Sequence, residues 1–333
     1  MTAREAIEQA QVFHLFVVGD VMLDAYLVGA VNRISPEAPV PVVEVRHREQ
    51  RLGGAANVAR NVLALGASVE LASVIGDDEG GELLLQRCGE LGIGSEAIIK
   101  SDARPTTVKN RIISDGQHLL RVDEEITTPI EEATEIELIA ACRQRWAQRR
   151  PDAVIFEDYD KGVLTPRVIA ALIAAAREAD IPTAVDPKFR QFLDYKGVTL
   201  FKPNLKELRE GLGLNGLDRN DDSAIAEATA AIQKQLGAHA VLVTLSERGV
   251  WILDEQGHHQ RIPAHPREIN DVSGAGDTVI ATACLLLAAG LKLQDLAAVA
   301  NLAGGLVCEK VGVVPVDKGR LLEEIHRIES ALG

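Results

Sequence analysis

The stretch NDVSGAGDT, residues 270–278, places a carboxylate beside three small residues at the start of an apolar helical pattern. Gly274, Ala275 and Gly276 allow the backbone to close around an anion, and the free N–H groups of a first helical turn attract negative charge. Phosphoryl transfer accounts for both features. The amides would stabilise the transferring phosphoryl group, and Asp277 would take the proton of the attacking hydroxyl. Taken alone, Asp277 is also an ordinary helix N-terminal acid.

The same stretch fits neither of the two common nucleotide-binding loops. No GK[ST] follows it, as a Walker A loop requires, and Val279 stands where the dinucleotide fingerprint has Gly or Ala. It also lies late in the chain, and no strand with a terminal acid follows its helix. A nicotinamide dehydrogenase is therefore a poor fit.

Polar residues follow several apolar, strand-like runs. They are Asp20 with Asp24, Asp158, Asp186, Asn204 and Thr244. Ligands of open α/β sheets bind beyond the carboxyl ends of the strands, where carboxylates accept hydrogen bonds from sugar hydroxyls. Each of these residues alone is more simply a helix cap or turn former, but their recurrence favours a shared polyol site. Gly53 and Gly54, before Asn57, allow close backbone approach to a ligand or simply a tight turn.

The elements that position these residues alternate along the chain. Apolar strand-like runs and segments of helical spacing predict an α/β fold, with a central, mostly parallel sheet and helices on both faces. GVWILDE and HHQRIPA form a predicted hairpin. Segments 39–48 and 105–123, the second a hairpin turning at Asp115-Gly116, fit the alternation poorly, and we expect them to pair as a small β-lid. No repeat or long linker interrupts the pattern, so a single domain over 1–333 is expected.

Composition restricts partners and location. The formal charge of -14 disfavours nucleic acid and anionic membranes as partners. The four cysteines are far apart and form no CxxC, which is typical of reduced thiols in a cytosolic protein. The N-terminus has no signal-peptide pattern, and the longest apolar stretch, TVIATACLLLAAGL, is too short to span a bilayer. We therefore expect a cytoplasmic protein.

With these motifs the chain resembles the PfkB (ribokinase-like) family of carbohydrate kinases over nearly its whole length. GGAANVARNVLALGA resembles the first family signature. NDVSGAGDTVIATA resembles the second, with DVS in place of the usual DTx. KPNLKE is similar to the NxxE element, with Asn204 and Glu207 in the matching positions. The resemblance implies a ribokinase-like fold, ATP and Mg²⁺ as cofactors, and Asp277 as the base beside an anion hole of Gly274, Ala275 and Gly276.

The resemblance also implies roles for other residues. Asn204 and Glu207 would organise Mg²⁺ through water, and Lys202 would reach the nucleotide phosphates. The residues at the nucleotide would be Thr244, Ser246, Glu247, Gly249 and Asn301. Those at the sugar would be Asp20, Asp24, Gly53, Gly54 and Asn57, joined by Asp186. The lid would close over the sugar and exclude water.

Longer stretches narrow the resemblance. GDVMLDAYLVGAVNRISPEAPVPVVEV, EDYDKGVLT and DPK are similar to the heptose 7-phosphate kinases of lipopolysaccharide core assembly. This implies phosphorylation of the anomeric hydroxyl of D-glycero-β-D-manno-heptose 7-phosphate. Such kinases are often fused to a nucleotidyltransferase domain; no HxGH motif occurs here, and a stand-alone kinase is expected. The alternatives are a kinase for another sugar or sugar phosphate, and a non-catalytic sugar-binding regulator.

A sugar phosphate needs cationic partners. The candidates are Arg104, Lys109, Arg111, Lys161 and Lys188, with Lys109, Arg111 and Lys161 preferred because the first two share one face of a strand and the third follows a strand end. A solvated surface cation is the alternative for each.

The segment PVPVVEV is apolar on both faces, and a lid strand covers substrate with only one. We therefore expect a homodimer clasped through the lids, the alternative being packing within the same subunit.

Overall fold

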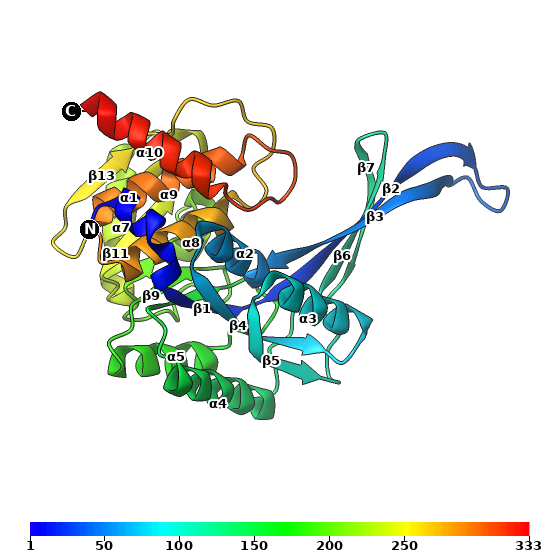
Figure 1. Cartoon of the computed structure of the whole chain (residues 1–333), viewed down its shortest axis with the longest axis horizontal. Coiled ribbons are helices and arrows are strands. Elements are labelled where there is room, and N and C mark those ends of the chain that lie inside the picture. Colours follow the sequence, from blue (N-terminus) through cyan, green and yellow to red (C-terminus); the bar gives the residue numbers. More distant parts are fainter. Residues whose placement is uncertain (333) are drawn as a thin grey trace.

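The computed structural model describes residues 1–332 and contains two separate β-sheets (Figure 1). In the larger sheet, the strands from β11 to β5 run parallel, and β12 and β13 add an antiparallel hairpin at one edge. Its strands, in spatial order, are β13 (His259–Ile262), β12 (Val250–Leu253), β11 (Ala240–Thr244), β10 (Leu200–Phe201), β9 (Thr183–Asp186), β8 (Ala153–Glu157), β1 (His14–Gly19), β4 (Ser68–Gly76) and β5 (Gly94–Ser101). The expected α/β fold and the second hairpin are confirmed.

Helices cover both faces of this sheet, because its central strands are apolar on both sides (Figure 1). One face packs against α1 (Ala3–Glu8), α2 (Ala55–Leu65), α8 (Ala275–Ala288), α9 (Leu293–Val307) and α10 (Lys318–Leu332), and the other against α4 (Glu132–Gln148), α5 (Pro166–Glu178), α6 (Leu205–Leu212) and α7 (Asp222–Leu236). In strand β1, Leu15 and Val17 join the first core while Phe16 and Val18 join the second. Helix α3 (Glu79–Leu91) also packs on the first core, and short 3-10 turns occur at Ala10–Val12 and Ser246–Arg248.

The smaller sheet projects to one side of the larger one (Figure 1). Its order is β3 (Pro41–Gly54), β2 (Val21–Ile34), β6 (Val108–Ser114) and β7 (Gln117–Glu124). The two predicted lid segments thus share a sheet, but the expectation that they pair with each other is wrong, because β2 lies between them. Strand β2 was missed because a single residue, Asp20, separates it from β1. The predicted turn is confirmed: Asp115 and Gly116 have φ of 49° and 79°, as a tight hairpin requires.

The two faces of the smaller sheet differ in chemistry. Directly opposed residues share a face, so Asp24 lies with its neighbours Arg51 and Lys109, and Tyr26 lies with Arg111. The other face carries alternate residues of the same strands, among them Leu27, Ile112, Leu120 and Val122. Leu120 and Val122 remain 56% and 43% exposed. One face is therefore charged, and the other is apolar and only partly covered.

Candidate active site

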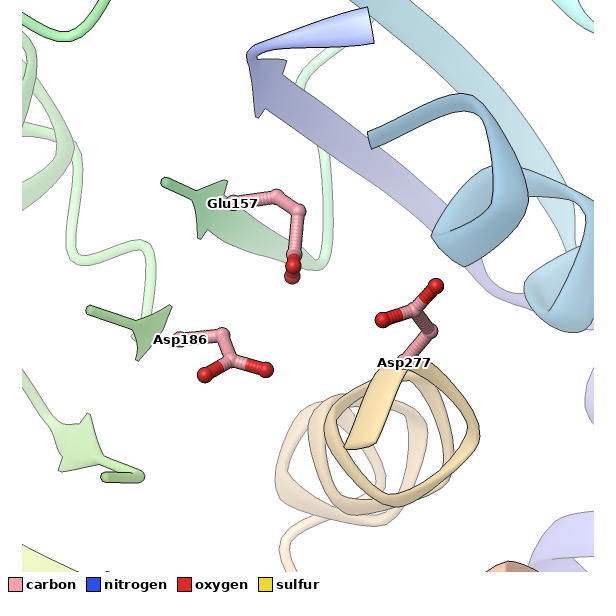
Figure 2. Close-up of side chains that lie close together, drawn as sticks. All are labelled: Glu157, Asp186 and Asp277. Carbon is pink, nitrogen blue, oxygen red and sulfur yellow. The ribbon is translucent and has the colours of Figure 1, made fainter. Parts of the chain in front are cut away.

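Three buried carboxyl groups meet at the carboxyl edge of the larger sheet. Glu157 ends β8, Asp186 ends the neighbouring β9, and Asp277 lies in the first turn of α8. Figure 2 shows their carboxyl groups pointing toward one another, and one oxygen of each lies within 4.8 Å of the others. Burial, followed by the nearby Asp186 and Asp277 charges, raises the pKa of Glu157 well above its usual range.

Two hydrogen bonds orient the predicted base. Asn57 Nδ2 donates to Asp277 Oδ2 at 2.6 Å, and the Tyr159 hydroxyl donates to Oδ1 at 3.0 Å. Burial raises the pKa of Asp277 to about 6, although the bond from Asn57 opposes this rise. A carboxylate that is fixed in place and titrates near neutral pH is suited to accept a proton from a hydroxyl.

The first turn of α8 offers free backbone donors next to this base. Gly274 is the N-cap, with a φ of 79°. The N–H groups of Gly274 and Gly276 have no acceptor within residues 1–332, whereas Ala275 already donates to the Val272 carbonyl at 3.3 Å. Of the three predicted amides, two are therefore free. A Cβ on Gly276 would lie 3.6 Å from Asp186 Oδ2 and 3.8 Å from Lys202 Nζ, so the turn lies directly against these groups.

Two lysines bring positive charge to the same edge. Lys202, only 2% exposed, places Nζ 2.8 Å from Asp186 Oδ2. Lys188 Nζ lies 2.5 Å from Glu207 Oε1 and 5.2 Å from the centre of the Tyr159 ring. Burial acts to lower the pKa of each lysine, but the neighbouring carboxylates, Asp186 first, outweigh it and raise both. Both ammonium groups therefore stay charged.

The predicted magnesium residues form a capping box at the start of α6. Asn204 Oδ1 accepts the Glu207 N–H at 2.9 Å, and Glu207 Oε2 accepts the Asn204 N–H at 2.8 Å. Because Oε1 is bound to Lys188, both carboxylate oxygens have protein partners. The NxxE spacing therefore has a structural role here, and any magnesium contact must share an oxygen that already has a protein partner.

The predicted nucleotide residues gather beyond β11. The backbone of Thr244 forms an isolated parallel β-bridge with that of Asn204. Gly249 has a φ of 86°, and a Cβ there would lie 2.1 Å from the Ile262 carbonyl oxygen, so only glycine fits. Ser246 and Glu247 lie in the 3-10 turn between them, and Glu247 pairs with Arg219 on the surface. Asn301 Nδ2 donates to the carbonyl of Pro263, which also adjoins Gly249, so Asn301 lies beside this group.

The predicted sugar residues do not all present free groups. Asp20 is 1% exposed and accepts backbone N–H bonds from the loop after β8, at 2.8 Å from Tyr159, 3.0 Å from Lys161 and 3.1 Å from Val163. Its visible role is therefore to hold that loop. Asn57 binds Asp277, as described above.

Asp24 and the two glycines lie at the root of the smaller sheet. Asp24 pairs with Arg111. A Cβ on Gly53 would lie 2.7 Å from Asp24 Oδ2, and one on Gly54 would lie 2.3 Å from the Asp20 carbonyl oxygen. Gly54, which also has a φ of 58°, is therefore required by this close approach to backbone, whereas a Cβ on Gly53 would meet only side-chain atoms of Asp24 and Met22.

The five cations predicted for a substrate phosphate do not form one group. Lys109 Nζ bonds Asp123 at 3.1 Å and Glu125 at 2.9 Å, and Lys161 Nζ bonds Glu125 at 2.8 Å. Arg104 is buried and donates to the Lys161 carbonyl. Lys188, as described, is paired with Glu207. The preferred cations thus lie near one another, but each already has a carboxylate partner.

Another arginine in this region has no such partner. Arg60, on α2, is half-buried, and it forms no ion pair with any carboxylate of residues 1–332. Burial, and then the charge of Arg51, lower its pKa. Arg51 lies 5.0 Å from the centre of the Tyr26 ring, and Arg111 lies 5.4 Å from the same ring. Three guanidinium groups therefore gather at the root of the smaller sheet.

Sequence reasoning missed Glu157 and Tyr159. Both belong to the stretch EDYDKG, in which only Asp158 and Lys161 were considered. The sequence does offer a signal, because two consecutive acids, Glu157 and Asp158, stand at the end of one apolar strand-like run. Since neighbouring side chains of a strand point to opposite faces, one of the two had to face Asp277.

A mostly parallel α/β sheet with a carboxylate beside a glycine-rich helix terminus, a buried lysine and a second, partly exposed lysine is an arrangement suited to phosphoryl transfer. Residues 12–318 match the model of the family described as pfkB family carbohydrate kinase. The chain belongs to this family and is an ATP-dependent carbohydrate kinase.

Curated relatives are longer than this chain. It is 42% identical over 312 residues to the bifunctional protein HldE of Wolinella succinogenes, a match that covers 94% of this chain and 64% of the relative. It is 41% identical over 317 residues to the protein of the same name from Methylobacillus flagellatus, covering 95% of this chain and 64% of that one. The chain thus spans just under two thirds of the length of these relatives.

Solved structures establish the ribokinase-like fold. Arabidopsis thaliana ribokinase complexed with ribose and ATP has a TM-score of 0.71 at 19% identity, covering 93% of this chain and 99% of that one. Escherichia coli phosphofructokinase-2 in complex with fructose-6-phosphate has a TM-score of 0.75 at 18% identity, covering 95% and 100%. Across residues 1–332, no helix combines the length and apolar character needed to cross a membrane.

Proposed function

We propose that this kinase phosphorylates the anomeric hydroxyl of D-glycero-β-D-manno-heptose 7-phosphate to give the 1,7-bisphosphate, in ADP-heptose and lipopolysaccharide inner-core biosynthesis. The stretches GDVMLDAYLVGAVNRISPEAPVPVVEV, EDYDKGVLT and DPK support this substrate by their resemblance to heptose 7-phosphate kinases. In the bifunctional relatives, more than a third of the length lies outside the match with this chain. A separate second activity of those proteins would reside there.

In the proposed reaction, Asp277 takes the proton of the anomeric hydroxyl as that oxygen forms a bond to the γ-phosphorus of ATP. The bond from that phosphorus to the β,γ-bridging oxygen breaks, and ADP leaves. Asn57 and Tyr159 hold the carboxylate in place. The free amides of Gly274 and Gly276, together with Lys202, stabilise the charge on the transferring group. The adenine and ribose would lie against the group formed by Thr244, Ser246, Glu247, Gly249 and Asn301.

Magnesium belongs to this proposal as the partner of the nucleotide. Glu207, fixed by its cap with Asn204, would hold Mg²⁺ through water, and oxygen donors of this kind suit that ion. The ion offsets the phosphate charge during transfer. Glu207 would have to share one of its oxygens between that water and its protein partner, Lys188 at Oε1 or the Asn204 N–H at Oε2.

The observation that carries the sugar-phosphate assignment is the cationic root of the smaller sheet. Arg51, Arg60 and Arg111 gather there. Arg51 is paired with Glu49 and Arg111 with Asp24, whereas Arg60 forms no ion pair within residues 1–332. The chain has a formal charge of -14, so the overall composition does not account for a cluster of cations at this place. An incoming phosphate would satisfy Arg60 and compete with Asp24 for Arg111. Lys109 and Lys161 would join it by leaving Glu125.

The test is a kinase assay with heptose 7-phosphate, the free heptose, fructose 6-phosphate and ribose, each with Mg²⁺ and ATP. We expect kcat/KM to be highest for heptose 7-phosphate. A preference for a hexose phosphate or a free sugar would contradict the heptose 7-phosphate assignment and leave the assignment as a sugar kinase unchanged. No turnover with any sugar would favour the alternative of a non-catalytic sugar-binding regulator.

We also propose that the chain acts as one kinase domain whose lid is the smaller sheet, and that it forms a homodimer through that lid. The exposed apolar residues of this sheet and of its β2–β3 connection support the dimer: Ile34, Val40, Val45, Leu119, Leu120 and Val122 are 42% to 60% exposed. The four cysteines are buried and unpaired, which supports a reducing, cytoplasmic location.

A further inference from the structure

Four chain connections join the smaller sheet to the rest of the molecule (Figure 1). Asp20 alone links β1 to β2, and β3 runs directly into α2 after Gly54. The segment 102–107 leads from β5 into β6, and the segment 125–131 leads from β7 into α4. A change in the position of the smaller sheet is therefore transmitted through these four places.

The first connection holds the loop that follows β8, residues 159–163. The Asp20 carboxylate accepts three backbone N–H groups of this loop, at 2.8, 3.0 and 3.1 Å. Asp20 is 1% exposed, so these bonds replace the water that its charge has lost. The carboxylate therefore fixes the loop from within the protein.

Two further connections bind the same loop at Lys161. The buried Arg104, in the segment 102–107, donates to the Lys161 carbonyl and, at 3.4 Å, to the carbonyl of Ile126. Both of its bonds within residues 1–332 thus go to backbone carbonyls. Glu125, at the start of the segment 125–131, accepts a bond from Lys161 Nζ at 2.8 Å. The N–H, the carbonyl and the side chain of Lys161 are thus bound to three different connections of the smaller sheet.

The backbone of this loop needs such support. Asp160 has a φ of 55°, which residues other than glycine rarely adopt, and its N–H is bonded to Asp158 Oδ1 at 2.8 Å. Gly162 has a φ of 90°, and a Cβ there would lie 2.1 Å from the Thr128 carbonyl oxygen. Conformations of this kind persist only where the surrounding structure holds them.

The loop and the fourth connection carry the two donors of the base. The Tyr159 hydroxyl donates to Asp277 Oδ1 at 3.0 Å. Asn57, three residues after Gly54, donates to Asp277 Oδ2 at 2.6 Å. Both hydrogen bonds that orient Asp277 therefore come from segments attached to the smaller sheet.

We propose that Asp20 and Arg104 are positioning residues, which hold loop 159–163 so that the Tyr159 hydroxyl orients Asp277. The position of the smaller sheet and the orientation of the base are thereby coupled. Arg104 acts on the loop and does not bind the substrate phosphate, because its guanidinium is already used by the two carbonyls. The inference rests on the proposed role of Asp277 as the base and is independent of which sugar the kinase accepts.

The test is a double-mutant cycle of Arg104→Gln and Tyr159→Phe, assayed with the sugar that the substrate panel shows to be turned over fastest. At pH 8 the base is ionised, since its pKa is about 6. Each variant should lower kcat about 10-fold, because a displaced base transfers the proton poorly, while KM for ATP and for the sugar changes little. If Arg104 acts through Tyr159, the double variant should be no slower than the slower single variant.

The midpoint of the pH profile of kcat is a second readout. The titratable and charged groups around Asp277 are Tyr159, Glu157, Asp186 and Lys202. Arg104 is bonded to none of them, so Arg104→Gln should raise the midpoint only by weakening the Tyr159 bond. In Tyr159→Phe protein, the same change should leave the midpoint where it is.

Two further variants complete the test. Asp20→Asn removes the charge that holds the loop and should give the same non-additive loss with Tyr159→Phe, which keeps the proposal testable if Arg104→Gln folds poorly. Arg150→Gln is the matched control. Arg150 also donates to two backbone carbonyls, but it lies between α4 and β8 at the opposite edge of the larger sheet. It should leave kcat and the midpoint unchanged.

Three results would overturn the proposal. They are a wild-type kcat in Arg104→Gln, losses that multiply to about 100-fold in the double variant, and a loss confined to KM for a phosphorylated sugar. Failure of the base assignment is seen separately, as a wild-type kcat in Asp277→Asn. Failure of the heptose assignment appears only in the substrate panel.

Discussion

The two sheets of this molecule present charge in opposite ways. At the edge of the larger sheet, carboxylates outnumber cations, and Glu157 has no partner within residues 1–332. On the charged face of the smaller sheet, Lys109 and Arg111 are each bound to an acid, as is Lys161 in the neighbouring loop after β8. Burial follows the same division: every residue of β8 is buried, while nearly all of β7 is exposed.

This difference assigns different tasks to the two regions. Strand ends covered by helices on both faces hold their side chains rigidly, which reacting groups require. Paired cations on a half-exposed sheet can exchange an acidic partner for an arriving phosphate, which recognition requires. We therefore expect variants of the larger sheet to change turnover, and variants of the smaller sheet to change substrate affinity or assembly.

The largest effect is expected at the base. Asp277→Asn should lower kcat by about 10²–10⁴-fold, because the proton of the sugar hydroxyl loses its acceptor. ATP affinity, measured by calorimetry, should change little. A variant with wild-type kcat would show that Asp277 is not the base. It would also contradict the expectation that the larger sheet determines turnover.

The next effect concerns the paired cations. Lys161→Ala and Arg111→Ala should each lower the affinity for heptose 7-phosphate by roughly 10- to 150-fold, the equivalent of about 1.5–3 kcal/mol for a charged hydrogen bond. KM for ATP and the rate with free heptose should stay nearly constant. Lys206→Ala, on an exposed lysine of α6, is the control. Equal losses on the phosphorylated and the free sugar, or no loss, would remove these residues from the phosphate site.

The apolar face of the smaller sheet is tested by assembly. Leu120→Glu places a charge on this face, where Leu120 is 56% exposed, and should weaken self-association at least about 10-fold. Light scattering over a range of protein concentrations measures this, with Lys206→Ala again as the control. A wild-type mass that stays monomeric at all concentrations would contradict the lid-mediated dimer.

The smallest effect concerns pH. Because burial raises the pKa of Asp277 to about 6, kcat should fall as the pH decreases through 6 and the base becomes protonated. Tyr159→Phe removes a hydrogen bond that lowers this pKa, so the midpoint should move upward by up to about one pH unit. The measurement is kcat between pH 5 and 8. A downward shift in the variant would contradict the role given to Tyr159.

Much of the fold and part of the site were predictable because they depend on neighbours along the chain. The Asp115-Gly116 turn, the α8 terminus and the Asn204–Glu207 cap each involve residues within a few positions. The order of the smaller sheet was not predictable. Strand β2 follows β1 after one residue and pairs with β6, which lies far along the chain. No pattern of neighbouring residues predicts that pairing.

The sequence by itself therefore determined the alternation of strands and helices, the glycine-rich start of α8 and the presence of Asp277, since propensity and side-chain period act locally. Only the tertiary structure decided that Glu157 meets Asp186 and Asp277, and that Glu125 binds both Lys109 and Lys161. These contacts join residues distant in the chain. Their charges and pKa values depend on burial, which arises only when the helices pack on the sheet.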